Sequence, residues 1–189
     1  MGRWEPDAAG RLRAAALELF TAVGYEETTV AAIADRAGVT SRTFFRYFAD
    51  KPEVLFAGSE GLEVAMAAAL AAAPEDASPR AALDAALDEA AALLVERSDF
   101  ARRRHAVILR NPALLERETM KMARLTESLA AGLRDRGVTD PVATMMAHAG
   151  VAAFRVAFSA WVDEPAIDLR HTMADNLGAL ARYIGSSNP

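Results

Sequence analysis

The stretch Val30–Lys51, VAAIADRAGVTSRTFFRYFADK, decides the fold, because its apolar residues and its turn are spaced for two short helices. Thr29 is a good N-cap for the first helix, and Gly38 can adopt the positive φ that is needed to leave it. Thr40 can cap the second helix, Ser41–Tyr47. We therefore predict two short helices joined by a tight turn.

The residue sizes in this stretch favour one particular helical pair. Its large apolar side chains recur where two crossing helices would face a common core, and Ala34 is small where the second helix must cross closely. The residues expected to face inward are Ile33, Ala37, Val39, Phe44 and Phe48. Spacing and size together predict a helix-turn-helix.

The other side of the second helix carries side chains suited to the major groove of DNA. Arg42 and Arg46 can make bidentate bonds to guanine, Ser41 can bond to several bases, and the Phe45 ring can touch a thymine methyl group. Hydroxyls, an ammonium and helix-start amides nearby can bind phosphate oxygens. The predicted DNA-binding residues are Thr29, Thr40, Ser41, Arg42, Thr43, Phe45, Arg46, Tyr47 and Lys51. The alternative is a helical hairpin whose charges are merely solvated.

About residues 10 to 56 resemble the tetracycline-repressor-like (TetR) family. The matching string is Thr29, Ile33-Ala34, Ala37-Gly38-Val39, Thr43-Phe44-Phe45, Phe48 and Lys51. Phe44 and Phe45 depart from the family, which often has Leu and Tyr there, so Phe45 lacks a hydroxyl for phosphate. The resemblance implies a helix-turn-helix domain followed by a helical domain that binds a ligand and pairs with a second copy.

Composition and charge agree with a helical chain. The 189 residues are 52% hydrophobic and 25% charged, with abundant alanine and few β-branched residues, which favours an all-α fold. The absence of cysteine excludes disulfides and zinc–thiolate sites. Residues 1–51 hold seven Lys/Arg and seven Asp/Glu, so the net charge of −5 comes entirely from the rest of the chain. This asymmetry permits DNA binding without demanding it.

Helical periodicity predicts the remaining elements, and capping signals mark where they begin. Asp50, with Glu53 three positions on, forms a capping box, and Ser78 precedes Pro79 at the first helical position. We expect helices at 7–23, 50–73, 79–96, 99–110, 112–136, 141–162 and 168–184. The expected domains are 1–51, which binds DNA, and 52–189, which binds ligand and dimerises. No charge-free apolar run reaches the roughly 18 residues of a membrane span, and residues 1–9 lack a signal-peptide core. We therefore expect a cytoplasmic protein without a membrane partner.

The last two predicted helices carry the candidate dimer interface. Helix 168–184 has a narrow apolar stripe, and helix 141–162 is apolar on most sides, so it needs partners on both faces. A two-fold four-helix bundle would cover the second face, and wholly intramolecular burial is the alternative. The predicted interface is Val151, Val156, Leu169, Met173, Leu177, Leu180 and Ile184. A dimer would read a palindromic operator in double-stranded DNA.

A ligand pocket between the helices of the second domain is a further hypothesis. Methionine fits irregular space, and ligand sites in helical proteins lie between helices. The candidate residues are Met66, Phe100, Met120, Met122, Leu125, His148 and Arg155, with ordinary core packing, or an ion pair to Asp175, as alternatives. The run Arg102, Arg103, Arg104 and His105 is interpreted as a solvated face, with an anionic ligand as the alternative.

No enzyme or cofactor signature is found in the sequence. The three histidines lack metal-helix spacing, and there is no phosphate-cradling Gly-Lys loop or serine nucleophile elbow. The resemblance implies a homodimeric transcriptional repressor that an unidentified small molecule releases from its operator. The alternative is a helical small-molecule-binding or adaptor dimer that does not read DNA.

Overall fold

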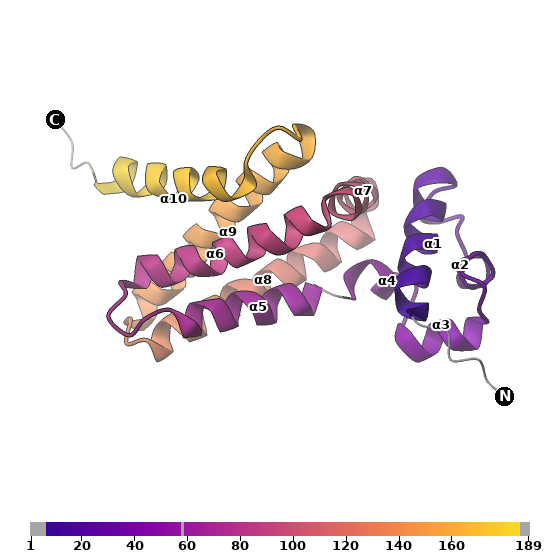
Figure 1. Ribbon diagram of the computed structural model, residues 1–189, viewed down its shortest axis with the longest axis horizontal. Helices are drawn as coiled ribbons and strands as arrows, with labels where there is room; N and C mark the ends of the chain where they lie inside the picture. Colours follow the sequence, from indigo (N-terminus) through magenta and orange to yellow (C-terminus); the bar gives the residue numbers. More distant parts are fainter. Residues whose placement is uncertain (1–6, 58, 186–189) are drawn as a thin grey trace. The chain divides into compact units, whose positions relative to one another are not determined.

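A computed structural model describes residues 7–57 and 59–185, and of residues 59, 60, 184 and 185 it describes the backbone only. The described residues form ten α-helices and confirm the all-α prediction (Figure 1). They are α1 (Ala8–Ala22), α2 (Val30–Arg36), α3 (Ser41–Tyr47), α4 (Glu53–Phe56), α5 (Ser59–Ala72), α6 (Pro79–Glu96), α7 (Ser98–Leu109), α8 (Pro112–Asp135), α9 (Asp140–Asp163) and α10 (Leu169–Gly185).

The chain forms two compact units whose boundaries differ from the predicted domains. The first unit comprises residues 1–59 and 99–117, and the second comprises residues 60–98 and 118–189. The first unit extends past residue 51 because the side chains of residues 54–56 are buried in its core. Val107, Ile108 and Leu114 join the same core from further along the chain. The first unit is therefore discontinuous in sequence.

The core of the first unit is built where α1, α2, α3 and α4 meet (Figure 1). Leu12, Ile33 and Phe44 are fully buried there, and Phe48 is 2% exposed. The rings of Phe44 and Phe48 lie 5.2 Å apart, within the range of favourable aromatic pairs. Burial of each such side chain contributes about 1.5–3 kcal/mol, so the inward pattern predicted from the sequence positions these short helices.

The single helix predicted for residues 50–73 is wrong, because the structure has two helices there. α4 has only four residues, and Ala57 leaves it with φ −61° and ψ 116°, an extended conformation. α5 then begins at Ser59. Asp50 caps α4 as predicted, since its Oδ1 accepts a hydrogen bond from the Glu53 amide at 2.8 Å. The Glu53 carboxylate, the other half of the predicted capping box, contacts Arg117.

The second unit is a helical bundle in which α10 packs on α9 and α6. Ser78 caps α6 as predicted, accepting a hydrogen bond from the Ala81 amide at 3.2 Å, with Pro79 in the first turn. α6 and α9 approach closely at Gly150, where an added Cβ would lie only 3.0 Å from the Leu83 side chain. A larger residue at this crossing would require the Leu83 side chain to shift by a few tenths of an ångström.

Most of the predicted dimer interface belongs to this internal core. Val151, Leu169, Met173 and Leu177 are each 5% exposed or less within one chain. They are covered because α6, α9 and α10 pack on one another, so for these four residues the alternative of intramolecular burial is correct. Val156 and Leu180 remain 62% and 38% exposed. The side chain of Ile184 lies outside the described residues.

Two stretches are long and apolar enough to cross a membrane by length and composition alone, Glu53–Ala72 and Asp140–Asp163. The second is α9, whose buried residues include Ala147, Phe154 and Trp161. The core helix of a soluble protein passes the same length and composition test. α9 fits that description, because it packs on α6 and α10.

Candidate nucleic-acid interface

Local hydrogen bonds set the geometry of the helix-turn-helix. The Thr29 Oγ1 accepts a hydrogen bond from the Ala32 amide at 3.1 Å, and the Thr40 Oγ1 accepts one from the Thr43 amide at 3.2 Å. Gly38, with φ +70°, makes the turn between the two helices. The two predicted caps and the predicted glycine turn are therefore present, and both threonines remain exposed.

One side of α3 is free to contact DNA. Phe44 is fully buried, whereas Arg42, Phe45 and Arg46 are exposed, Phe45 to 57%. The Phe45 ring lies edge-on to the Phe44 ring at 5.5 Å, so the exposed ring is supported by the core. α3 thus presents two guanidiniums and an apolar ring together, as the sequence pattern predicts.

Arg46 and Tyr47 form a pair on the surface of α3. The Arg46 guanidinium lies 4.9 Å from the centre of the Tyr47 ring, and its Nη2 donates a hydrogen bond to the Tyr47 hydroxyl at 3.2 Å. A cation over an aromatic face is stabilised by about 0.5–1 kcal/mol at an exposed site. This pair therefore favours one orientation of the Arg46 side chain in the free protein.

Lys51, predicted to bind phosphate, has a different role in the structure. Its ammonium donates hydrogen bonds to the backbone carbonyls of Tyr25 at 2.8 Å, Thr28 at 3.1 Å and Glu26 at 3.4 Å. It also lies 4.2 Å from the centre of the Tyr25 ring. Because an ammonium has three donors, these carbonyls use all of them. Lys51 ties the turn after α3 to the loop between α1 and α2.

The Tyr25 side chain is part of the same arrangement. It is buried against Phe20, with ring centres 5.0 Å apart. Burial raises the pKa of the Tyr25 phenol, and the negative charges of Glu26 and Asp50 raise it further. The phenol therefore stays neutral, and the ring serves as a surface for the Lys51 cation.

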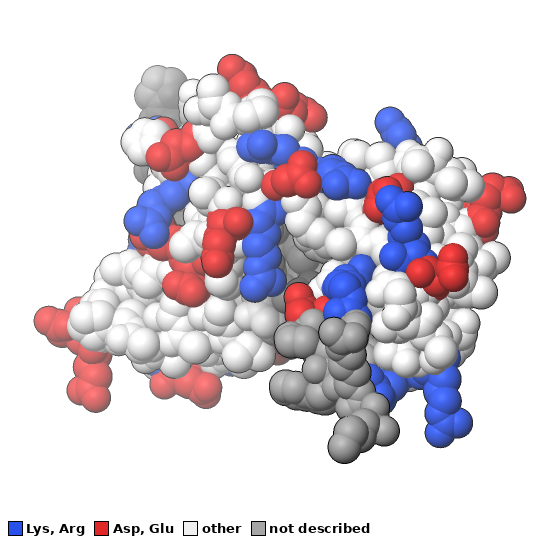
Figure 2. Space-filling view, turned by 45° about the vertical axis from the view of Figure 1, so that its right-hand side comes forward, with Lys and Arg blue, Asp and Glu red and all other residues white. Residues whose placement is uncertain are grey.

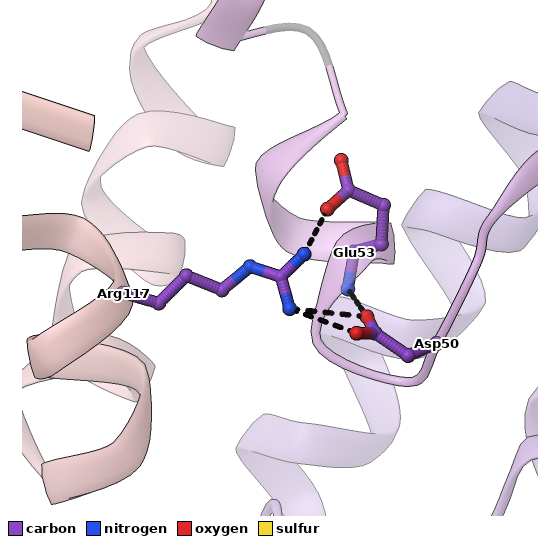
Figure 3. A network of polar contacts seen from close by, with 3 residues as sticks. All are labelled: Asp50, Glu53 and Arg117. Carbon is purple, nitrogen blue, oxygen red and sulfur yellow. Dashed lines mark hydrogen bonds and ion pairs between the residues drawn. The ribbon is translucent and has the colours of Figure 1, made fainter. Parts of the chain in front are cut away.

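A second set of contacts, made by Arg117 of α8, also stabilises the turn after α3 (Figure 3). The Arg117 Nη1 donates to the two carboxylate oxygens of Asp50 at 2.9 and 3.2 Å, and its Nη2 contacts the Glu53 carboxylate. Desolvation alone would lower the pKa of Arg117, but hydrogen bonds and charge from both carboxylates outweigh it and raise the pKa. No periodicity or motif connects residues 50 and 117, so this contact could not be predicted from the sequence.

The run Arg102–His105, interpreted as a solvated face, includes one residue with a clear internal role. Arg104 is half-buried, its Nε donates to the Leu55 carbonyl at 2.8 Å, and its guanidinium lies 4.9 Å from the centre of the Phe56 ring. Arg103 instead pairs with Asp99 on the surface of α7, at 3.5 Å. The solvated interpretation is therefore wrong for Arg104.

Charge is mixed rather than segregated on the face of the molecule that Figure 2 shows. Figure 2 shows acidic and basic side chains interspersed over the face in view. Within the helix-turn-helix, Arg36 pairs with Glu18 of α1. Cations that are already paired with carboxylates contribute little to long-range attraction, so the exposed guanidiniums of Arg42 and Arg46 are the most direct contacts available for DNA.

The predicted ligand residues differ in burial and belong to both compact units. Met66 and Leu125 are buried in the second unit, and Met122 is half-buried. Phe100 packs against the core of the first unit. Met120, His148 and Arg155 are exposed, and Asp175, suggested as an ion-pair partner, pairs with His171 at 3.2 Å. The pocket hypothesis for these residues stays a prediction.

These elements define a helix-turn-helix DNA-binding protein, with a capped α2, a glycine turn and an α3 that exposes arginines. The family description "Bacterial regulatory proteins, tetR family" matches residues 12–57, and the description "MftR C-terminal domain" matches residues 77–185. The chain belongs to the TetR family of bacterial regulatory proteins. It is a DNA-binding transcriptional regulator and not an enzyme.

Known relatives support this assignment. The HTH-type transcriptional regulator TcmR of Streptomyces glaucescens is 46% identical over 71 residues, which are 38% of this chain and 31% of TcmR. The chain thus matches about a third of that curated relative. Thermus thermophilus FadR, solved in complex with lauroyl-CoA, is 25% identical with a TM-score of 0.61, covering 96% of each chain. SmeT, the efflux-pump repressor of Stenotrophomonas maltophilia, is 21% identical with a TM-score of 0.64, covering 93% of this chain and 89% of SmeT.

Proposed function

We propose that this regulator is a homodimeric repressor that reads a palindromic operator with α3 and is released from it by a small molecule. The observation that carries the proposal is the division of α3 into two faces. Phe44 is fully buried, while Arg42, Phe45 and Arg46 are exposed on the opposite side. A short helix of this kind enters the major groove and reads base edges there.

The exposed side chains divide into base contacts and phosphate contacts. Arg42 and Arg46 bind guanine, and Ser41 and Phe45 contact neighbouring bases, each good bidentate pair contributing about 1–3 kcal/mol of discrimination. Hydroxyls at the helix starts and at the end of α3 bind phosphate and set the register. The proposed phosphate contacts are Thr29, Thr40, Thr43 and Tyr47. Lys51 is left out, because its donors are used within the protein.

The outer face of α9 is the proposed dimer surface. Val142, Met145, Ala152 and Val156 follow one another at helical spacing, and all four are exposed. Met145 is 63% exposed and Val156 is 62% exposed. Leu180 of α10 adds a further partly exposed apolar side chain. A second copy, related by a two-fold axis, would cover this stripe with its own and form an isologous interface.

The proposed release mechanism depends on the second unit. One relative has been solved as a SmeT–triclosan complex and another as a complex with lauroyl-CoA, so a small organic molecule is the expected kind of ligand. Such a molecule lowers operator affinity only by binding more tightly to a conformation whose two α3 helices are wrongly spaced. Operator binding in turn must weaken ligand binding by the same factor. We expect this regulation to take place in the cytoplasm.

Selection of bound duplexes from a random DNA pool tests the proposal. The expected result is a palindrome whose half-sites are separated by about 34 Å or a multiple, which is one turn or several turns of duplex. An enriched single half-site would contradict the dimer and leave base recognition intact. No enrichment would contradict operator recognition and favour a helical small-molecule-binding or adaptor dimer.

A further inference from the structure

The carboxylates that follow α3 are held by a side chain from far along the sequence. Asp50 and Glu53 lie in and after the turn that ends α3, and one Arg117 guanidinium contacts both of them (Figure 3). The Arg117 side chain is 30% exposed and the Glu53 side chain is 20% exposed, so water screens this pair only in part. Charge-assisted bonds from a planar guanidinium fix both direction and distance.

α4 depends on such outside contacts. With four residues it is far too short to be stable alone, because helix nucleation is unfavourable. Its last residue, Phe56, is fully buried, and its ring lies 4.9 Å from the Arg104 guanidinium and 5.4 Å from that of Arg117. Two arginines of the segment 99–117 thus hold α4, and with it the turn that precedes it.

We propose that Arg117 is a positioning residue for DNA recognition, which sets the orientation of α3 through Asp50 and Glu53. The inference rests on the proposed base reading by α3. Arg117 lies on α8, outside residues 12–57 that match the helix-turn-helix family description, yet it belongs to the same compact unit. The DNA-reading unit is therefore complete only when α8 supplies this guanidinium.

The loss of the guanidinium would have a defined physical effect. Asp50 and Glu53 would remain as two like charges at the end of α3 without their shared cation, and Asp50 would still have to cap α4. Repulsion between them would open the turn and misplace α3 relative to the groove. We expect operator affinity to fall by about tenfold or more, the equivalent of one lost hydrogen bond to a charged group.

The experiment compares Arg117→Gln with Arg103→Gln in the full-length protein. Both changes remove one positive charge from the segment 99–117, but Arg103 pairs only with Asp99 on the surface. Operator affinity is measured at several salt concentrations, together with amide hydrogen exchange of residues 50–57 in the free protein. Arg117→Gln should weaken binding, leave the salt slope equal to that of Arg103→Gln, and speed exchange in residues 50–57. Arg103→Gln should leave exchange and affinity near wild type.

Three results would overturn the inference. First, wild-type operator affinity in the Arg117→Gln protein would show that α3 does not need the contact of Arg117 with Asp50 and Glu53. Second, a salt slope lower than that of Arg103→Gln would show that Arg117 contacts phosphate. If Arg117→Gln does not fold, Glu53→Gln is used instead, because it removes one of the two carboxylate partners of Arg117. It should weaken operator binding and speed exchange in residues 50–57, both to a smaller extent. Third, unchanged exchange and affinity in Glu53→Gln would contradict the proposal. Failure of the wild-type protein to select any duplex would instead contradict the proposed function.

Discussion

Polar side chains of the helix-turn-helix have a contact within the protein before any DNA is present. Thr29 and Thr40 cap helices, Arg46 lies on Tyr47, and Lys51 binds three carbonyls. Residue type alone predicted all of these as DNA contacts. A threonine cap can keep that second role, because its hydroxyl oxygen has two lone pairs and a proton. An ammonium with three occupied donors has no such spare capacity.

Lys51 provides a prediction at the scale of a single residue. Lys51→Ala should lower the free energy of unfolding by about 1–2 kcal/mol, because three carbonyls lose a charged donor. Lys51→Arg should not restore it, since a planar guanidinium does not present three converging protons. Urea denaturation measures both variants. Unchanged stability together with a salt slope lowered by about one would restore the predicted phosphate contact.

At the scale of elements, the parts that the sequence predicted are those that local chemistry determines. The caps Thr29, Thr40 and Ser78 and the turn at Gly38 depend on residues only a few positions apart, and all are confirmed. The break between α4 and α5 was missed although Gly58-Ser59 supplies a helix-stop residue and a capping residue in the sequence. The Arg117 contact was missed because it joins residues 67 positions apart, which no periodicity reports.

Gly38 provides a prediction at this scale. Gly38→Ala should destabilise the protein by about 1–2 kcal/mol, because an L side chain is strained at φ +70° although nothing lies within 4 Å of the new Cβ. Gly61→Ala is the matched control, since Gly61 lies in α5, also has open space, and has an ordinary helical φ. Thermal unfolding should show a loss for the first variant and none for the second. Equal effects would contradict the argument from backbone strain.

At the scale of the whole molecule, the apolar pattern of the last two helices predicted which residues are buried. It could not distinguish cover by the same chain from cover by a second copy. The periodicity of Leu169, Met173 and Leu177 is the same whether the covering surface is α6 and α9 of the same chain or a second copy. The structure shows intramolecular cover for these residues, and it leaves the stripe on the outer face of α9 exposed. The compact units differ from the predicted domains for a related reason, because residues 99–117 belong to the first unit.

The dimer proposal leads to a prediction about assembly. Met145→Glu and Val156→Glu should yield folded monomers in sedimentation, because each would place two symmetry-related charges in an apolar interface. Val95→Glu is the control, since Val95 is 52% exposed on α6, away from this stripe. It should sediment like the wild type. Dimers in all three variants would move the interface elsewhere on the second unit.

The central claim, that α3 reads bases, is tested most directly by repeating the duplex selection with Arg42→Ala. Arg36→Ala is the control, because Arg36 carries the same charge in the same motif but pairs with Glu18. We predict that Arg42→Ala loses the preference at one base pair, at the symmetric position in both half-sites, and binds the original operator about 1–3 kcal/mol more weakly. Arg36→Ala should select the wild-type sequence. An unchanged sequence preference in the Arg42→Ala protein would contradict the claim.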